Sequence, residues 1–438
     1  FETGEAFVSW KTDAGTFKRS IFVSRASGVA IMKISGPKGN LGFRIGLTHR
    51  NPRPELGEET LRNSQDRFSN LVKEAEVTAK DNRIAWRNEF TRSYEGSIQS
   101  IEGVVKVVSS GGSVTANGNQ LEVEGSTSAT VYIDIEPNYV LADSAIGSMA
   151  YTLDNLKSYD QELRSHSAIH GKIFSRMKLD LGGGDQALTT EELLAVSNTE
   201  NLNRTLIEKQ FDAGRYNILS SIGELPPNLQ GVWGGTYVPG WASDYTHNGN
   251  VPSAIASLLM GNMAELMPSY TSYIESIIPG MKISAKNIFG ARGVLLPSRS
   301  TTNGYNNALA PNFAGGFWVG GAAWAAHFFY DYYLYTGDEK FLKEHALPFM
   351  EQACLFFEDY LTLGEDGFYV FSPTQSPENT PGNTDSQGSF NATSEIAMAR
   401  ELLENSISAS KLLGVNEEKI GVWSEMLNKL PPYLVSVD

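Results

Sequence analysis

Two different spacings of hydrophobic positions divide the chain near residue 143. Before that point, short apolar runs with partial two-residue alternation are separated by Gly, Ser and Pro, a pattern typical of β-strands. The segment "VTANGNQLEVEG" carries an Asn117-Gly118 step between alternating residues, which predicts a β-hairpin. Several such strands with no helical pattern between them predict an antiparallel β-sandwich over residues 1–142.

After that point, apolar residues recur at intervals of three and four, which predicts helices. Residues 143–199 are predicted to form a helical linker, with a capping box that starts at Thr189. Over residues 200–438 the predicted helices come in pairs, and one pair divides at Gly337. We therefore predict a multidomain chain, β then α, whose paired helices with long loops suit an (α/α)6 toroid.

Length and charge narrow the classes of partner. A chain of 438 residues is too long for one hydrophobic core. The net charge of −15 argues against nucleic acid or an anionic membrane surface as partner. No apolar run is long enough to span a bilayer, so membrane insertion is not expected. The 18 Tyr, 21 Phe and 7 Trp fit either large cores or a stacking surface for sugars. The oligomeric state is not readable from the sequence.

Cysteine and histidine usage gives no sign of a cofactor or a metal. The single Cys354 lies in a helical pattern and is predicted to be a buried small hydrophobe. His166 and His170 share a helical i, i+4 spacing but lack a companion carboxylate motif, so metal binding is not expected. The first ten residues, "FETGEAFVSW", read as a strand without a leading Met, and we expect the chain to be a piece of a longer protein.

Three long loops rich in Gly, Pro, Asn and Thr interrupt the helices, at 223–250, 293–316 and 372–391. Loops of this length inside a helical domain usually carry function or are disordered. The first loop contains Trp233 and Trp241 among many amides, as a sugar-binding surface requires, although both rings could equally be core residues.

The segment "HNGN" places Asn248 and Asn250 two residues apart. In an extended strand both amides would point to one side and could bind one water or one hydroxyl, whereas the same letters also form an ordinary turn. The neighbouring His247 is either structural or part of the site. Arg299, the only charge in residues 295–312, either hydrogen-bonds sugar hydroxyls or is solvated.

The third loop reads "SPTQSPENTPG" and contains one carboxylate, Glu378. Its prolines restrict the backbone, and catalytic side chains often sit on loops held by a rigid scaffold. Most loop glutamates are merely solvated, so the loop alone leaves both interpretations open.

Taken together, the segments "FDAGRYNILSS", "LPPNLQGVW", "WASDYTHNGN", "GGAAWAAHFFYDYYLYTGD", "SPTQSPEN" and "ATSEIAMAREL" resemble glycoside hydrolase family 95, the α-L-fucosidase and α-L-galactosidase family. The resemblance covers residues 200–438, which it implies to be an incomplete (α/α)6 toroid that carries the catalytic machinery, and, more loosely, the β-rich part. It implies an inverting exo-glycoside hydrolase in which Glu378 is the general acid and Asn248 and Asn250 hold the attacking water. A family aspartate further towards the C-terminus would assist that water. The candidate substrate-binding residues are Trp233, Trp241, His247, Arg299 and Asn379.

Two segments depart from the family pattern. After the second asparagine the chain continues "VPSAIASLL" instead of a Met-Asn-Tyr-Trp segment, and "SRSTTNGYNNALAP" replaces a loop with paired histidines. The substrate is therefore left as an α-L-fucoside or a related α-L-linked sugar, such as an α-L-galactoside, in an oligosaccharide or polysaccharide. The alternative is a non-catalytic or altered-specificity glycan-binding relative, and a phosphorylase on a similar toroid ranks last. The resemblance also implies a bacterial protein that is secreted or periplasmic.

Overall fold

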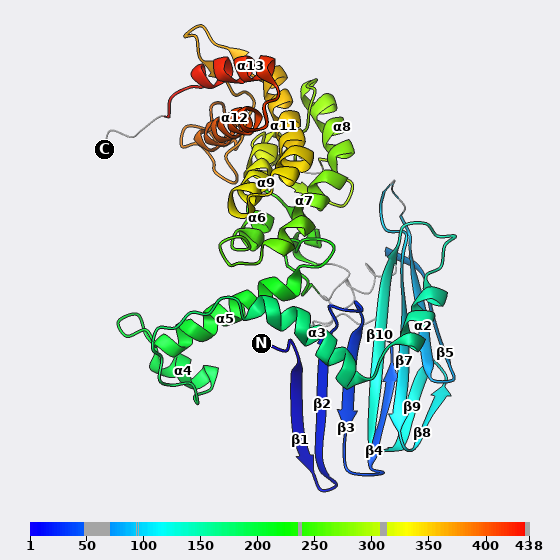
Figure 1. Ribbon diagram of the computed structural model, residues 1–438. Coiled ribbons are helices and arrows are strands. Elements are labelled where there is room, and N and C mark those ends of the chain that lie inside the picture. The colour runs from blue at the N-terminus through cyan, green and yellow to red at the C-terminus, as the bar shows by residue number, and fades with distance from the viewer. Residues whose placement is uncertain (48–70, 93, 95, 235–238, 307–312, 434–438) are drawn as a thin grey trace. The chain divides into compact units, whose positions relative to one another are not determined.

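The computed structural model describes residues 1–47, 71–92, 94, 96–234, 239–306 and 313–433 (Figure 1). The chain forms two compact units. The first contains residues 1–220 and 235–239, and the second contains residues 221–234 and 240–438. The predicted domain boundaries after residues 142 and 199 stay predictions.

The first unit begins with ten antiparallel strands in two sheets. The larger sheet has the order β1-β2-β3-β10-β7-β6-β5, and the smaller has the order β4-β9-β8. The strands are β1 (Ala6–Thr12), β2 (Gly15–Val23), β3 (Ala30–Ser35), β4 (Leu41–Gly46), β5 (Val72–Lys80), β6 (Arg83–Phe90), β7 (Ser100–Ser110), β8 (Ser113–Asn117), β9 (Gln120–Ser126) and β10 (Ser128–Asn138).

The two sheets bury one shared core, which confirms the predicted sandwich. Leu121 and Val123 of β9 are inward-facing neighbours by strand alternation, and they pack in the same cluster as Val105 and Val107 of β7. The predicted hairpin is also confirmed, because Asn117 pairs with Gln120 across a two-residue loop.

Helices cover part of the other face of the larger sheet (Figure 1). Met149 and Leu153 of α2 (Ile146–Asn155) and Tyr159 of α3 (Tyr159–Phe174) pack with Phe22 and Ile31 of the sheet. This region continues with α4 (Thr190–Val196) and α5 (Arg204–Ser221). The predicted capping box of α4 is present, since the Thr189 hydroxyl accepts a hydrogen bond from the Glu192 amide.

The second unit is helical, so the predicted order of β then α is confirmed. The helix α9 ends at Gly337, which has φ 68°, and Asp338 caps the next turn by accepting from the Phe341 amide. The elements are η2 (Gly240–Ser243), β11 (Tyr245–Thr246), α6 (Asn250–Ile255), η3 (Ala264–Leu266), α7 (Met267–Ser276), α8 (Ile278–Phe289), β12 (Arg299–Ser300), η4 (Ala314–Phe317), α9 (Gly321–Thr336), α10 (Glu339–Phe341), η5 (Leu342–Ala346), α11 (Leu347–Tyr360), β13 (Thr362–Leu363), β14 (Tyr369–Val370), α12 (Thr393–Leu413) and α13 (Glu417–Asn428).

The core of this unit lies between α9, α11 and α12, which pack against one another, while α13 packs on α12 (Figure 1). Phe329 of α9 stacks on Phe349 of α11 with the ring centroids 4.7 Å apart. Cys354 of α11 is fully buried as predicted, and burial raises the pKa of its thiol to about 12. These packed helices fix the ends from which the long loops emerge.

Candidate active site

A cavity of about 650 Å³ in the second unit is lined by residues from all three of the long loops singled out above. Its wall is formed by Leu229, Gln230, Trp241, Thr246, Asn248, Gly249, Asn250, Arg299, Phe313, Pro377 and Glu378. Five of the predicted site residues are therefore brought together, from segments that lie far apart in the sequence. The end of the second loop, residues 307–312, lies outside the described part of the chain.

The first two loops are held together by the short strands β11 and β12. Thr246 pairs with Arg299 in this antiparallel ladder, and both residues line the cavity. Strand alternation turns the intervening side chains the other way. His247 is accordingly buried, and its Nε2 lies 2.9 Å from the Ser300 hydroxyl. Burial lowers the pKa of His247 to about 3, so its imidazole is neutral and supports the wall from behind.

Asn248 and Asn250 both face the cavity, on either side of Gly249. Of the two conformations considered for this segment the structure has the turn, over residues 247–249, and Asn250 is already the first residue of α6. The two amides nevertheless reach one space, and each offers both a donor and an acceptor to a water or a hydroxyl.

Arg299 is anchored rather than free. Its Nε donates to a carboxylate oxygen of Asp244 over 2.6 Å, and its terminal nitrogen donates to the Trp241 carbonyl over 2.9 Å. Asp244 is buried and also accepts from the Thr246 hydroxyl over 2.7 Å. The guanidinium therefore joins β12 to the segment that carries Trp241, and it presents its remaining edge to the cavity.

Trp241 lies in an unusual stretch of backbone at the cavity wall. Trp241, Ala242 and Ser243 all have left-handed φ angles, of 49°, 59° and 46°. Such angles are rare for residues with a Cβ and persist where surrounding contacts hold them, as the Arg299 bond to the Trp241 carbonyl does here. The indole is 71% exposed, so one apolar face of the ring is available to a ligand.

Glu378 sits on residues 372–391, which we call the Glu378 loop. Thr374 and Ser389 pair through two backbone hydrogen bonds of 2.9 and 2.8 Å, which close the base of the loop. The Tyr360 hydroxyl of α11 donates to the Pro373 carbonyl over 2.9 Å. The Glu378 side chain is exposed, and it is the only carboxylate among the residues that line the cavity in the described part of the chain.

Three predicted site residues do not line this cavity. Trp233 is 61% exposed, and its ring lies against the backbone of Gly231. His247 points away from the cavity, as described above. Asn379 is exposed beyond Glu378, and its side-chain amide donates to the Ser376 hydroxyl over 3.1 Å. Their predicted substrate-binding roles stay predictions.

Several residues of the cavity wall and one buried glutamate could not be identified from the sequence. Gln230 and Phe313 line the cavity, yet a lone amide or aromatic residue in a loop carries no distinctive signal. Glu395, in the first turn of α12, is completely buried. Burial raises the pKa of its carboxyl to about 8. A glutamate at a helix start usually faces solvent, so no sequence pattern distinguishes Glu395 from an ordinary surface residue.

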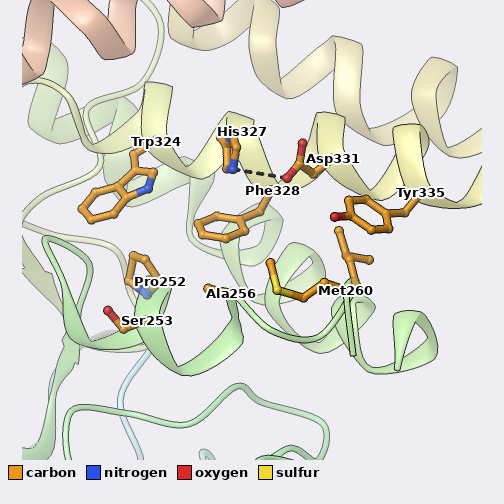
Figure 2. Close-up of a pocket in the computed structure, with 10 residues that line it drawn as sticks. Pro252, Ser253, Ala256, Met260, Trp324, His327, Phe328, Asp331 and Tyr335 are labelled. Carbon is orange, nitrogen blue, oxygen red and sulfur yellow. Dashed lines mark ion pairs between the residues drawn. The ribbon is translucent and has the colours of Figure 1, made fainter. Parts of the chain in front are cut away.

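A second, smaller cavity of about 260 Å³ lies between α6 and α9 (Figure 2). Pro252, Ala256 and Met260 face Trp324 and Phe328 across it, and it carries no amide. At one side His327 is paired with Asp331, one turn along α9, over 3.2 Å. The other imidazole nitrogen lies 2.7 Å from Glu401 of α12.

Two further searches bear on what this chain could bind. Over the described ranges, no group of three or more His, Cys, Asp or Glu side chains is placed to hold a metal ion. Among the same residues, no helix has both the length and the apolar character needed to cross a bilayer.

Comparison with known proteins gives a consistent pattern. The family model described as the glycosyl hydrolase family 95 catalytic domain matches residues 158–438, and the family 65 N-terminal domain matches residues 1–141. Alpha-L-fucosidase 2 of Arabidopsis thaliana is 28% identical over 466 residues, which cover 100% of this chain and 54% of that protein. Probable alpha-fucosidase A of Aspergillus niger is 30% identical over 242 residues, or 51% of this chain and 29% of that protein.

The chain thus spans about half the length of the first of these relatives and less of the second. Among solved structures, a human-microbiome protein named as a kojibiose phosphorylase superposes with a TM-score of 0.66 at 11% identity. That match covers 98% of this chain and 56% of the other. At so low an identity the likeness concerns the fold alone.

Proposed function

The chain belongs to glycosyl hydrolase family 95, and we propose that it hydrolyses the terminal α-L-fucosyl, or a related α-L-glycosyl, residue of a glycan. The observation that carries this proposal is the meeting of Glu378, Asn248 and Asn250 on one cavity wall. Hydrolysis with inversion needs a proton donor on one face of the sugar and a held water on the other, and an exposed carboxyl group and two amides that share one space can supply these two parts.

In the proposed reaction, Glu378 donates a proton to the glycosidic oxygen as the bond to the anomeric carbon breaks. Asn248 and Asn250 orient a water on the opposite face of the sugar, so that its oxygen attacks as the leaving group departs. An asparagine is not a Brønsted base at neutral pH, so a carboxylate must accept the proton of that water. The family resemblance assigns this role to an aspartate.

The remaining wall suits a pyranose. The exposed face of Trp241 and the ring of Phe313 can cover the C–H face of a sugar, and Arg299 and Gln230 can bind its hydroxyls. Fucose differs from galactose of the same series by a methyl group in place of a hydroxymethyl group. An apolar neighbour such as Leu229 at that carbon would favour the fucoside, but a hydrophobic pocket rejects one added hydroxyl only weakly. Activity on both sugars is therefore proposed.

The first experiment is a panel of α-L-fucosides and α-L-galactosides, both aryl glycosides and disaccharides, incubated with the whole gene product. Proton NMR at early times should show the β-anomer of the released sugar, as inversion requires. Glu378→Gln should lower kcat on the disaccharide by about 10³-fold, because it removes the proton donor. Equal rates for this variant and the parent enzyme would remove Glu378 from the mechanism.

A second candidate function is glycan binding without turnover. It is favoured by one observation: the described cavity wall offers no second carboxylate beside Glu378. Titration calorimetry on the same sugars separates the two functions. A binder would show heat of binding and no released monosaccharide, whereas the hydrolase would release monosaccharide in the Glu378-dependent way described above.

A secreted or periplasmic location also belongs to the proposal and rests on the family resemblance alone. Cell fractionation with an antibody to this chain would test it. Recovery of the protein in the cytosolic fraction alone would contradict it.

A further inference from the structure

Glu395 connects two parts of the cavity wall from behind. It lies in the first turn of α12, next to α9 and α11 in the core of the second unit (Figure 1). One carboxyl oxygen accepts the backbone N–H of Val319 over 3.1 Å. The backbone N–H of Gln375 also faces this carboxyl group and favours its charged form, while the second carboxyl oxygen, Oε2, is buried without a close hydrogen-bond partner. Both partners are backbone groups of segments that carry wall residues.

Further contacts connect Gln375 with Glu378, the proposed general acid. Gln375 is fully buried, and its side-chain amide donates to the side-chain oxygen of Gln387 over 2.9 Å. The amide nitrogen of Gln387 in turn lies 3.5 Å from the backbone carbonyl of Glu378. A line of hydrogen bonds therefore leads from α12, through both sides of the Glu378 loop, to the residue that carries the carboxylate.

The contact with Val319 holds a second segment, residues 313–319, which we call the Phe313 segment. Val319 lies between η4 (Ala314–Phe317) and α9, and Phe313 of the cavity wall lies just before η4. Space around the carboxyl is tight, since a Cβ added at Gly320 would come within 3.2 Å of the Glu395 Cγ. The Glu395 side chain therefore has little freedom to move, and the backbone amides that bind it are restricted in the same way.

We infer that Glu395 is a positioning residue, which holds the Glu378 loop and the Phe313 segment at a fixed distance across the cavity. This inference rests on the proposed function, because it assigns Glu395 to the placement of the general acid. Its raised pKa agrees with this role, since a neutral carboxyl can accept backbone N–H bonds without the cost of a buried charge. A glutamine at this position would keep the shape and the accepting oxygen.

The test compares kcat on two substrates whose leaving groups differ in how much they need protonation. A glycoside with a dinitrophenolate leaving group needs little protonation, whereas a disaccharide needs a well-placed acid. We expect Glu395→Ala to lower kcat on the disaccharide by about 100-fold, as for misplacement of a catalytic group by roughly 1 Å. Its kcat on the dinitrophenyl glycoside of the same sugar should stay within about threefold of the parent value. KM should change little on either substrate, and Glu395→Gln should restore most of the lost rate.

Ser406→Ala provides the matched control. Ser406 is buried further along α12, where its hydroxyl lies 3.3 Å from the Cys354 sulfur and has no part in the loop. We expect Ser406→Ala to change kcat on both substrates equally, and Glu395→Ala to lower kcat on the disaccharide far more than on the dinitrophenyl glycoside. That result would attribute the effect of Glu395→Ala to positioning and not to a general loss of packing.

A second variant keeps the inference testable if Glu395→Ala does not fold. Gln387→Ala removes the bond from the Gln375 side chain and the link to the Glu378 carbonyl but leaves Glu395 in place, and Gln387 is only half-buried. It should lower the disaccharide rate by about tenfold and spare the dinitrophenyl glycoside. Equal losses on both substrates, or no loss on either, in Glu395→Ala or in Gln387→Ala would overturn the inference.

Glu378→Gln, measured on the same two substrates, separates the inference from the proposed function. A strong leaving-group dependence in that variant, without one in the Glu395 and Gln387 variants, leaves Glu378 as the acid and refutes the positioning role. No leaving-group dependence in Glu378→Gln refutes the acid assignment, and the inference falls with it.

Discussion

The two cavities of the helical unit both use the short helix α6, yet they contain different chemistry. The larger one includes the first residue of α6, Asn250, and places it beside loop residues that offer amides, a guanidinium and an exposed carboxylate. The smaller one is lined by Pro252 of the same helix and by Ala256 directly after it, and it carries no amide side chain (Figure 2). Its acid, Asp331, is already paired with His327.

This difference shows why shifted pKa values alone are a poor guide to the active site here. At the smaller cavity, hydrogen bonding to Glu401 raises the pKa of His327, while burial raises that of Asp331. Ion pairs that stabilise a fold produce such shifts as readily as catalysis does. The larger cavity is distinguished instead by groups that face an open space with unused hydrogen-bonding capacity.

The largest effect that separates the two cavities is expected for the paired amides. Asn248→Ala and Asn250→Ala should each lower kcat about 100-fold, because the attacking water loses its orientation, and the double variant should be little worse than either. Ser253→Ala is the control, since Ser253 lies on α6 but lines the smaller cavity. Steady-state kinetics on the disaccharide measures all four proteins. A Ser253 variant as impaired as the asparagine variants would mean that α6 matters only for folding.

The anchoring of Arg299 should have an intermediate effect, measured on stability. Arg299→Ala leaves Asp244, whose side chain is 3% exposed, without its ion-pair partner. We expect the free energy of unfolding to fall by about 2 kcal/mol, because a buried carboxylate left unpaired is costly and the 30% exposed arginine was partly screened.

The exposed pair of Arg292 and Asp359 gives the comparison for this prediction. Arg292 is 63% exposed, so Arg292→Ala should lower the free energy of unfolding much less than Arg299→Ala does. Urea denaturation of both variants measures the difference. Equal losses would show that Arg299 does not anchor the wall more firmly than an ordinary surface pair.

The smallest expected effect concerns the pH dependence of the pair between His327 and Glu401. The folded state raises the pKa of His327 above its ordinary value of 6.5, so the folded protein binds that proton more tightly than the unfolded chain. The resulting stability is fully present below pH 6.5 and is lost as the pH rises through the higher folded value.

His327→Gln should therefore be less stable than the parent at pH 5.5 by about 0.5–1 kcal/mol, a value reduced for solvent exposure of both side chains. By pH 9 this difference should largely disappear. Urea denaturation at the two pH values measures it, and a difference that grows with pH would contradict the direction of the shift. Activity of this variant at pH 7 should remain near that of the parent, because the smaller cavity has no proposed catalytic role.

Much of the fold was predictable because it depends on local rules. The alternation in "QLEVEG" places Leu121 and Val123 on the buried face of β9, as the strand period requires. Gly337 ends α9 in the left-handed conformation expected of a C-terminal glycine. From Ser253 onward the apolar residues keep a helical spacing, yet the helix is interrupted by a left-handed Asn262 between α6 and η3. Apolar spacing does not register such a break.

Site residues were predictable where a short motif combines suitable chemistry with suitable spacing. They were not predictable where burial in the fold determines the role of a side chain. Asn248, Asn250 and Glu378 were found from short motifs, and they do share a cavity. His247 and Arg299 carried equal weight in the sequence, yet strand alternation sends them to opposite sides of the wall. The burial of Glu395 depends on the packing of α12 against α9 and α11, which no local pattern contains.

The pairing of β11 with β12 has a consequence for how this site can vary in length. Thr246 and Arg299 face the cavity, while Tyr245 and Ser300 occupy the alternate positions. Inserting one residue between Thr246 and His247 would reverse the side on which the following side chains lie, turn the Asn248 amide away from the cavity and expose the buried imidazole of His247. Substitutions can therefore change which sugar fits, whereas one-residue changes of length in this segment would abolish the site. A mutagenesis library should therefore keep the length of the segment from Tyr245 to Asn248 constant.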